Sequence, residues 1–334
     1  MAETPILTVD VGTSALKACL YQGDGRLADT VSRSYGYRTP RPGWAEGEPE
    51  AWWRALGQAL SALRAAGHDL RRVQMIGLTG QMHTAVLLGE EGEAIPPTIL
   101  WLDRRAAAET AELQAMFRLP PYHLNSTYTL PKLLWLARHQ PGALRQTRTL
   151  LWPKDYLRYR LTGERATDPT EAGGAALLDW QTGRWALERL HPTGLSAEVL
   201  PPLRPAESLA APLLPEVAAG LGLNPEARLI IGAGDVIAIL GGAPPDPGRL
   251  TCSLGSSSMV YVLLGPSQWL DDPQGRIYVY RIGPHRRHRH HPARRDSSSC
   301  PTWRANGVPS GAMTCVGPSW VWGCTTTVPT CCGP

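Results

Sequence analysis

The chain contains one arrangement twice: an apolar strand that runs directly into a glycine-containing turn carrying an aspartate. The first copy is Ile6–Val9 followed by Asp10-Val-Gly-Thr-Ser14, and the second is Leu229–Ile231 followed by Gly232-Ala-Gly-Asp235. A chain of 334 residues is long enough for roughly two domains at about 150 residues each. The repeated arrangement therefore predicts two units that begin alike.

The first turn has the composition of a phosphate-binding turn. Gly12 frees backbone N–H groups, Thr13 and Ser14 add hydroxyls, and Asp10 can hold a magnesium ion or its waters. The segment Ser253-Leu-Gly-Ser-Ser-Ser258 repeats the glycine and the hydroxyls in the second half. Each turn alone is common in hairpins. Together they are what a nucleotide clamped between two similar domains needs.

Hydrophobic periodicity predicts an α/β order of elements. Three strands joined by short turns open the chain, and spacings of four, four and three along Trp52, Leu56, Leu60 and Leu63 indicate one helix face. Further strands and helices are expected along the chain. The strands are expected at 73–78, 85–88, 98–101, 229–231 and, pivoting on Gly255, 251–264; the helices are expected at 105–118, 131–139 and 154–161.

Two polar residues at strand ends are candidates for chemistry. Asp235 follows an apolar strand and two glycines, Gly232 and Gly234, which have no side chains. A carboxylate at such a position can accept a proton from a substrate hydroxyl. The alternative is a turn aspartate that bonds its own backbone. His83, in Gly80-Gln-Met-His83, follows another strand and can bind a polyol, although a lone histidine is more often structural.

Charge and cysteine change abruptly near residue 281. Residues 282–334 carry six arginines and one acidic residue, which leaves 27 basic against 28 acidic residues in 1–281. The body has no basic surplus, so no nucleic-acid partner is expected. Five of the seven cysteines also lie after residue 299, beside several histidines, but without a CxxC pair a zinc site is a weak hypothesis.

No membrane or export signal is evident. No stretch approaches the ~18 apolar residues that span a bilayer, and the first residues lack the basic and apolar regions of a signal peptide. Two isolated cysteines in the body are typical of a reducing compartment. We therefore expect a cytoplasmic protein with no membrane partner, and a homodimer is left open.

Eight segments, in order over residues 6 to about 280, resemble the FGGY family of carbohydrate kinases, and within it the xylulokinases. The segments are LTVDVGTSALKACL, GWAEGEPEAWW, IGLTGQMHTAVLL, TILWLDRR, LPKLLWLARH, LWPKDYLRYRLTGERATD, IIGAGDVIA and LTCSLGSSSMVYV. Gly-Gln-Met-His is the feature that leans toward xylulokinases over gluconate, glycerol or ribulose kinases. Gly80–His83 and Trp101–Arg105 also argue against a chaperone-type actin-like ATPase.

The resemblance implies a ribonuclease-H-like (actin-like ATPase) α/β fold in which two domains close on ATP and sugar. The chemistry implied is transfer of the γ-phosphoryl of ATP to a hydroxyl of a ketopentose such as xylulose, with Mg2+ offsetting charge. The positions that match the family carry distinct roles. They are Asp235 as catalytic base and sugar ligand, Met82 and His83 as sugar contacts, Asp10, Gly12, Thr13, Ser14, Gly255, Ser256 and Ser257 as phosphate turns, and Asp10 also beside the metal.

Two positions depart from the xylulokinase pattern, which usually has asparagine at both. Val236 follows the catalytic aspartate and Leu102 follows Trp101. Both lack a polar group for a sugar hydroxyl, so another polyol or a sugar acid is an alternative acceptor. A non-catalytic sugar-binding remnant is the alternative from another class.

The domain prediction has three parts. Residues 1–225 form an N-terminal domain, 226–281 begin an ATPase domain that is incomplete, and 282–334 form an aberrant, disordered tail. A frameshifted terminus, a disordered basic tail and a metal or nucleic-acid module are the three interpretations of this last segment.

Overall fold

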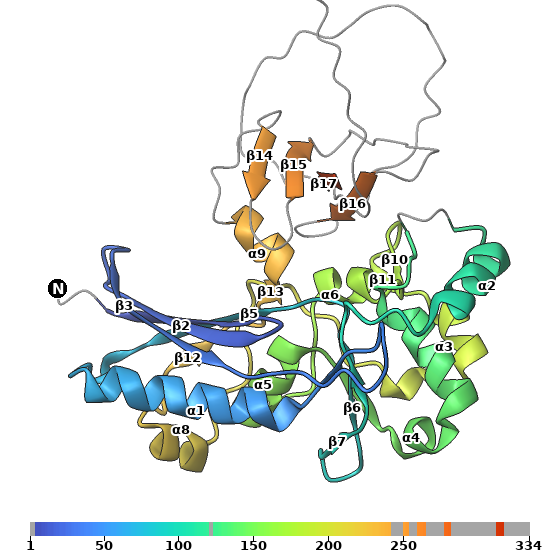
Figure 1. Ribbon diagram of the computed structural model, residues 1–334. Coiled ribbons are helices and arrows are strands. Elements are labelled where there is room, and N and C mark those ends of the chain that lie inside the picture. The colour runs from blue at the N-terminus through green and yellow to red at the C-terminus, as the bar shows by residue number, and fades with distance from the viewer. Residues whose placement is uncertain are drawn as a thin grey trace, which may run out of the picture.

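The central sheet combines an antiparallel meander with parallel strands. Its six strands run in the order β12–β5–β1–β2–β3, with β13 also paired to β5 (Figure 1). β1, β2 and β3 are antiparallel neighbours, whereas β5 is parallel to β1, β12 and β13. The bounds are β1 (Ile6–Val11), β2 (Ala15–Tyr21), β3 (Leu27–Ser34), β5 (Met75–Gly80), β12 (Arg228–Leu229) and β13 (Ala233–Gly234). The computed structural model describes residues 4–119, 123–241, 250–253, 259–264, 277–281 and 312–316.

Alternation of side chains gives the sheet its buried face. Leu7, Val9 and Val11 of β1 are buried beside Leu16 and Ala18 of β2, because successive residues of a strand point to opposite faces. Helix α1 (Pro49–Ala65) packs against β2 and β3 and buries the predicted face of Trp52, Leu56, Leu60 and Leu63. The expected opening strands and this helix are confirmed.

Helix α1 begins with a residue suited to that position. Pro49 occupies the first turn of α1, where a missing N–H leaves no internal hydrogen bond unmade. Helices α5 (Pro153–Thr162) and α8 (Pro215–Leu221) also begin with proline, and both contact α1. The three helices cover one side of the central sheet (Figure 1).

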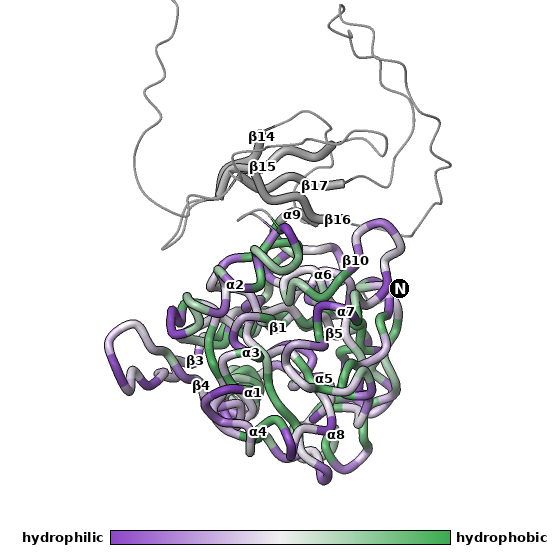
Figure 2. Tube along the Cα trace, turned by 90° about the vertical axis from the view of Figure 1, so that its right-hand side faces the viewer, coloured by the Kyte–Doolittle hydropathy of each residue, from purple (hydrophilic) through white to green (hydrophobic). Residues whose placement is uncertain are grey.

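A second core lies beside the first. It is built around α2 (Ala107–Phe117), α3 (Thr129–His139) and α4 (Pro141–Gln146), with a three-stranded sheet in the order β7–β6–β9. These strands are β6 (Val86–Leu88), β7 (Ala94–Ile95) and β9 (Thr149–Leu151). Figure 2 shows apolar segments passing through the interior and polar ones along the outer loops. The helices expected at 105–118, 131–139 and 154–161 are confirmed.

The remaining elements are short. The strands are β4 (Glu46–Gly47), β8 (Thr98–Ile99), β10 (Leu178–Asp179) and β11 (Arg184–Trp185), and the helices are α6 (Pro169–Gly174), α7 (Leu187–Leu190) and α9 (Asp235–Gly241). Three 3₁₀ turns cover Leu70–Arg72, His191–Thr193 and Ala197–Val199. Helix α6 was not predicted, and it proves central to the site.

Four strands near the C-terminus form a separate sheet, in the order β14–β15–β17–β16. They are β14 (Leu250–Ser253), β15 (Met259–Leu264), β16 (Ile277–Arg281) and β17 (Ala312–Val316). β14 pairs antiparallel with β15, which confirms the expected pair of strands; the turn at Gly255 lies outside the described residues. Within 282–334 only β17 is described, so the prediction of a disordered tail, and the weak zinc hypothesis there, stay predictions.

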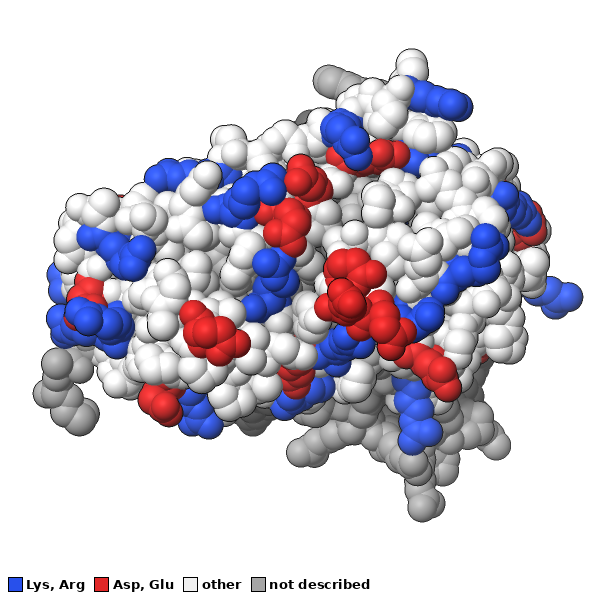
Figure 3. Space-filling model, turned by 90° about the horizontal axis from the view of Figure 1, so that it is seen from below, with Lys and Arg blue, Asp and Glu red and all other residues white. Residues whose placement is uncertain are grey.

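The predicted division at residue 225 is not marked by a break in the sheet. β12 and β13 follow that position and both pair with β5, so they extend the N-terminal sheet. Side chains of both charges intermingle on the face seen from below (Figure 3). Among the described residues, none of the helices is long and apolar enough to cross a membrane.

Candidate active site

The sheet register brings the two sequence-predicted aspartates to the same edge. Asp10 on β1 and Ala233 on β13 are both paired with Thr79 of β5, so the three residues form one row across three strands. Thr79 Oγ1 donates to the Ala233 carbonyl at 2.8 Å, which fixes the row. Asp235 comes directly after β13. Ligands bind at the carboxyl ends of parallel strands in sheets of this kind.

Asp10 is a partly buried carboxylate, and one of its two oxygens has no hydrogen-bond partner among the described residues. That oxygen is Oδ1, and it is buried. Burial raises the pKa of Asp10, and the charge of Lys17 on β2 opposes that shift. A carboxylate oxygen without a partner is the ligand that a hard cation takes. Asp10 therefore fits the predicted position beside a metal.

The turn after Asp10 is tight. The Gly12 amide donates to the Ala15 carbonyl at 3.0 Å. A Cβ at Gly12 would lie 2.9 Å from that same carbonyl oxygen, closer than real Cβ atoms come, so the turn requires glycine. The Ser14 side chain is exposed and Thr13 is partly buried. The predicted first phosphate turn is thus compact, and its Gly12 N–H is bonded within the turn.

Side chains from other elements hold this turn. Trp101 Nε1 donates to Thr13 Oγ1 at 2.8 Å. The Gly12 carbonyl accepts from Tyr35 O–H at 2.6 Å and from Gln81 Nε2 at 3.2 Å. Gln81 precedes Met82 and His83, so the phosphate turn and the predicted sugar-binding loop are directly bonded to each other.

His83 is held in a single protonation state and tautomer. Its Nδ1 lies 2.6 Å from the Gly174 carbonyl, and because a carbonyl only accepts, Nδ1 carries the proton. Burial, followed by the charge of Lys132, lowers the pKa of His83 to about 3. The imidazole is therefore neutral near pH 7, and Nε2 presents a lone pair. It can accept a hydrogen bond from a hydroxyl.

The backbone of His83 is strained and strongly supported. Its φ of +66° is rare for a residue with a side chain. The His83 carbonyl accepts from Thr129 Oγ1 at 3.0 Å and from Lys132 Nζ at 3.4 Å. The ring packs edge-on against Tyr128, with centroids 4.7 Å apart. Strain that the surroundings hold in place is typical of functional positions.

Lys132 is a buried lysine beside this loop. Its Nζ donates to the Thr127 carbonyl at 2.7 Å in addition to His83. Burial lowers the pKa of Lys132 well below its usual range, while the charge of Asp103 acts in the opposite direction. Lys132 therefore fixes two backbone carbonyls around the histidine.

Asp235 is the first residue of helix α9, which corrects its expected place in a turn. Its Oδ1 accepts from the Val236 amide at 2.7 Å. Burial raises the pKa of Asp235 to about 7, and the charge of Asp10 adds to the rise although the Val236 hydrogen bond opposes it. A carboxyl with a pKa near 7 is suited to take a proton at neutral pH.

Met82 joins the two halves of the site. Its side chain is buried and lies against Gly234, the residue before Asp235, with no space for a side chain between them. The structure thus brings together Asp10, Gly12, Thr13, Met82, His83 and Asp235. The predicted second phosphate turn at Gly255, Ser256 and Ser257 lies outside the described residues.

The sequence model for the N-terminal domain of the FGGY family of carbohydrate kinases matches residues 5–241. That range contains every site residue described above. The chain belongs to this family.

Individual relatives give the same result. The xylulose kinase of Escherichia coli (strain K12) is 34% identical over 279 residues, which are 81% of this chain and 56% of the relative. A crystal structure described as a xyloylose kinase from Brucella ovis is 35% identical, with a TM-score of 0.76 over 82% of this chain and 57% of that one. The xylulose kinase of Rhodospirillum rubrum is 26% identical, with a TM-score of 0.76 over 83% and 58% of the two chains.

These matches confirm the expected ribonuclease-H-like, actin-like fold of the FGGY kinases. They also show that the chain spans about half the length of the relatives it matches. Of the two departures from the xylulokinase pattern, Leu102 packs against the main hydrophobic core. Val236 is partly buried next to Asp235.

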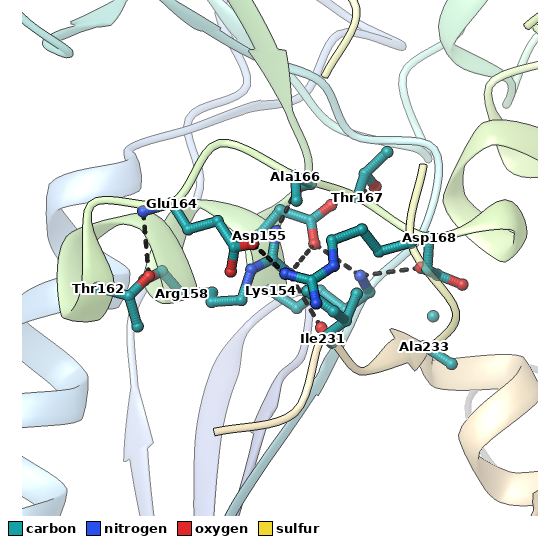
Figure 4. Close-up of polar contacts among 12 residues, drawn as sticks. Lys154, Asp155, Arg158, Thr162, Glu164, Ala166, Thr167, Asp168, Ile231 and Ala233 are labelled. Atoms are coloured by element: carbon teal, nitrogen blue, oxygen red, sulfur yellow. Dashed lines mark hydrogen bonds and ion pairs between the residues drawn. The ribbon is translucent and has the colours of Figure 1, made fainter. Parts of the chain in front are cut away.

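A cluster of charged side chains, all of them fully buried, includes Asp168, the residue that caps helix α6 in this FGGY chain (Figure 4). Lys154 Nζ is 2.7 Å from Asp155 Oδ1 and 2.9 Å from Asp168 Oδ1, and Arg158 Nη1 is 2.6 Å from Asp155 Oδ1. Burial acts against charge on Lys154, but the carboxylates of Asp155 and Asp168 outweigh it and raise its pKa. Arg158 also donates to the Ile231 carbonyl at 2.9 Å, on the segment that leads to Asp235.

Helix α6 connects this cluster with the site. Asp168 caps the helix by accepting from the Thr170 amide at 2.8 Å. Thr170 Oγ1 accepts from the Gly234 amide at 3.0 Å, and the Gly174 carbonyl accepts from His83. Between them lies Glu171, whose buried carboxyl oxygens have no partner among the described residues and whose pKa burial raises well above the usual range.

Sequence reasoning placed Gln81 and Trp101 in candidate acceptor-site segments without predicting their contacts, and it assigned no role to Lys132 or Thr170. Their contacts with the site join residues 49 to 88 positions apart, and local pattern gives no register for such pairs. One local signal was available: Asp168-Pro169-Thr170 combines a capping aspartate with proline at the first helical position. That signal predicts the start of α6, although it says nothing of what the helix binds.

Proposed function

We propose that this chain acts in an ATP-dependent sugar kinase, in which the γ-phosphoryl group of ATP passes to a hydroxyl of a ketopentose. The observation that carries the proposal is the pair of protonation states in one site. Asp235 has a pKa of about 7 and His83 one of about 3. One group is ready to take a proton at neutral pH and the other is a fixed neutral acceptor.

In this proposal Asp235 is the general base. Its carboxylate accepts the proton of the acceptor hydroxyl as that oxygen forms its bond to the γ-phosphorus and the bond between the γ-phosphorus and its bridging oxygen breaks. The neutral His83 orients the sugar by accepting a hydrogen bond from a second hydroxyl at Nε2. In this proposal the Gly12–Ser14 turn binds phosphate oxygens.

Asp10 is the residue that we propose holds Mg2+ or its waters. Its buried Oδ1 has no partner among the described residues, as a cation ligand requires. When bound to ATP, Mg2+ offsets the negative charge of the phosphates. The charge of Asp10 also helps to keep Asp235 protonatable near neutral pH.

The acceptor that we propose is a ketopentose, and xylulose in particular. Support comes from Gly80-Gln-Met-His83 in the site and from relatives named xylulose kinase at 30–35% identity. Val236 next to the base and Leu102 after Trp101 are the two features that set this chain apart from the usual xylulokinase pattern. A cytoplasmic location and a homodimer stay predictions from the sequence.

Calorimetry and product detection together test this function. The purified chain is titrated with xylulose, ribulose, glycerol and gluconate, and each mixture with Mg-ATP is examined for a phosphorylated product by mass spectrometry. We expect xylulose to bind best and to be the acceptor that gains a phosphoryl group.

Other outcomes have definite meanings. Preference for glycerol or gluconate would replace ketopentose by another polyol or a sugar acid. Sugar binding without any phosphorylated product would favour the non-catalytic sugar-binding alternative. Failure of every sugar to bind at millimolar concentration would remove the acceptor site itself.

A further inference from the structure

Helix α6 makes one polar contact with each half of the acceptor site. Thr170 and Gly174 are four residues apart, which places them on the same face of the helix, one turn from each other. Thr170 contacts the strand that carries Asp235, and Gly174 contacts His83. No role is assigned to either residue by the function proposed above.

The contact with the base strand is a single buried hydrogen bond. The Gly234 amide donates to Thr170 Oγ1 at 3.0 Å, and Gly234 directly precedes Asp235. Without that hydroxyl the Gly234 N–H would be buried and unpaired, which costs free energy or moves the strand. The orientation of the peptide that leads into Asp235 therefore depends on Thr170.

The contact with the acceptor loop uses backbone and close packing. The Gly174 carbonyl accepts the His83 Nδ1 proton at 2.6 Å and so fixes the ring and its tautomer. A Cβ at Gly174 would lie 3.0 Å from Met82 Cε and 3.4 Å from His83 Nδ1. A methyl group there would press on both predicted sugar contacts.

The N-terminus of helix α6 is held by the buried charge cluster. Asp168 accepts from the Thr170 amide at 2.8 Å, and its other oxygen lies 2.9 Å from Lys154 Nζ in the buried cluster. Short helices are weak on their own. The cap and the ion pair give α6 the rigidity that a spacer needs.

We propose that α6 sets the spacing between the base and the acceptor-binding histidine, with Thr170 and Gly174 as positioning residues for Asp235 and His83. Thr170 acts on the base side and Gly174 on the sugar side. The proposal rests on the proposed function for what the site does, but the two contacts can be tested without it.

Two variants separate the two sides. Thr170→Val keeps the shape of the side chain and removes the hydroxyl, whereas Thr170→Ser restores the hydroxyl. Gly174→Ala adds one methyl group toward Met82 and His83. Thr110→Val is the matched control, since Thr110 is also buried and its hydroxyl bonds a backbone carbonyl, that of Ala106, within helix α2.

Residue-resolved amide exchange and imidazole 15N shifts are measured first, on the full chain without ligand. In Thr170→Val we expect the Gly234 amide to exchange about threefold to tenfold faster, as loss of one hydrogen bond predicts, while amides of β1 and the His83 shifts stay as in the parent. Thr170→Ser should return Gly234 to parental exchange. Gly174→Ala should move the His83 15N shifts and leave Gly234 unchanged.

Sugar calorimetry and product formation then divide the effects. Gly174→Ala should weaken ketopentose binding about threefold to tenfold, and Thr170→Val should lower the rate of product formation with affinity within about twofold of the parent. A merely structural role would speed exchange across the whole sheet in Thr170→Val and change affinity and rate alike. That result, or one that Thr110→Val reproduces, overturns the proposal.

Two further outcomes are decisive. If Thr170→Val does not fold, the parent still provides a test, because a Gly234 amide that exchanges as fast as an exposed one contradicts the contact. If no sugar binds the parent, the proposed function fails. The exchange and 15N data need no sugar and still decide whether α6 holds Gly234 and His83.

Discussion

The molecule contains two groups of charged side chains, one fully buried and one partly buried. They differ in whether each charge has a partner of opposite sign. In the cluster of Lys154, Asp155, Arg158 and Asp168, each charged group has an opposite charge within 3 Å. In the site, Asp10 and Asp235 form no ion pair with a described residue, and each lies within range of the other's charge. One group is neutralised internally and the other is not.

The difference indicates that the cluster supports the fold, whereas the site is suited to chemistry. Burial acts on both groups, but in the cluster the partner charges overcome it and keep Lys154 and Asp155 ionised. In the site nothing overcomes it, so the pKa of Asp235 rises and that of His83 falls. Buried ionisable groups without an oppositely charged partner destabilise a fold. They are therefore concentrated where function requires them.

Removing the base should have the largest effect on activity. We expect Asp235→Asn to lower phosphoryl transfer about a hundredfold to ten-thousandfold, because the amide cannot take a proton and general-base assistance is typically of this size. Sugar affinity should change little, since the amide keeps the shape and one acceptor oxygen. Product formation and calorimetry are measured side by side.

Asp24→Asn is the control for that variant. Asp24 is a turn aspartate that accepts from the Arg26 amide at 2.9 Å, which is the structural alternative to a base role for Asp235. It should leave transfer unchanged. A rate within about threefold of the parent in Asp235→Asn, far short of the range given for general-base assistance, would remove Asp235 from the base role.

Breaking the matched cluster should affect stability above all. Lys154→Met leaves Asp155 and Asp168 buried without their shared cation, and removing one partner of a buried pair typically costs about 3–5 kcal/mol. Denaturant unfolding of the parent and the variant measures the loss. Arg54→Met, which removes an exposed ion pair with Glu48, should change stability far less. If both variants lost the same free energy of unfolding, the buried cluster would contribute no more to stability than an exposed ion pair.

The sequence predicted one of these two groups much better than the other. The alternation of Leu7, Val9 and Val11 is a local signal and is confirmed. The strand-to-turn change was expected at Asp10, but pairing with β2 and β5 keeps Asp10 and Val11 in β1, so the turn begins two residues later. His83 and Met82 were predicted as sugar contacts through their motif, and that role stays a prediction. Lys154 and Arg158 instead occur in a helix that looks like an ordinary polar surface helix, because their burial depends on Asp168 and on the Ile231 carbonyl far along the chain.

Helix α9 and helix α6 illustrate the same limit. Asp235 follows an apolar run and two glycines, which predicts a turn, yet pairing of β13 with β5 makes Asp235 the first residue of a helix. Thr170 sits in a short segment with three neighbouring small residues and no periodic pattern. Its role follows only from the neighbouring strand, 64 residues later in sequence.

Because Asp235 has no ion-pair partner among the described residues and a raised pKa, it should make the stability of the chain depend on pH. The pKa of Asp235 is about 7 in the folded chain against an ordinary value of 3.8. The folded state therefore holds a proton that the unfolded state releases, and this stabilisation is present below about pH 4 and is lost as pH rises to about 7. Between pH 5 and pH 8 the parent should lose of order 2 kcal/mol relative to Asp235→Asn.

Urea unfolding of both proteins at several pH values measures that difference, in which titrating groups that do not interact with Asp235 cancel. Asp10→Asn adds a second test. Because the charge of Asp10 contributes to the raised pKa of Asp235, its removal should move the loss of stability to lower pH. If the free energy of unfolding of the parent and of Asp235→Asn changed with pH in the same way, the raised pKa of Asp235 would be contradicted.

The smallest expected effect concerns the neutral half of the site. His83→Ala removes one hydrogen-bond acceptor for a sugar hydroxyl, so ketopentose affinity should fall about threefold to tenfold, or 0.5–1.5 kcal/mol. Nucleotide affinity should stay near that of the parent, since the Gly12–Ser14 turn is held by Trp101, Tyr35 and Gln81 and not by His83. His68→Ala is the matched control, because His68 is also partly buried and bonded, to Asp29 at 3.0 Å. If His83→Ala weakens ATP and sugar equally, or changes neither, then His83 has a structural role and only the carboxylate half of the site remains functional.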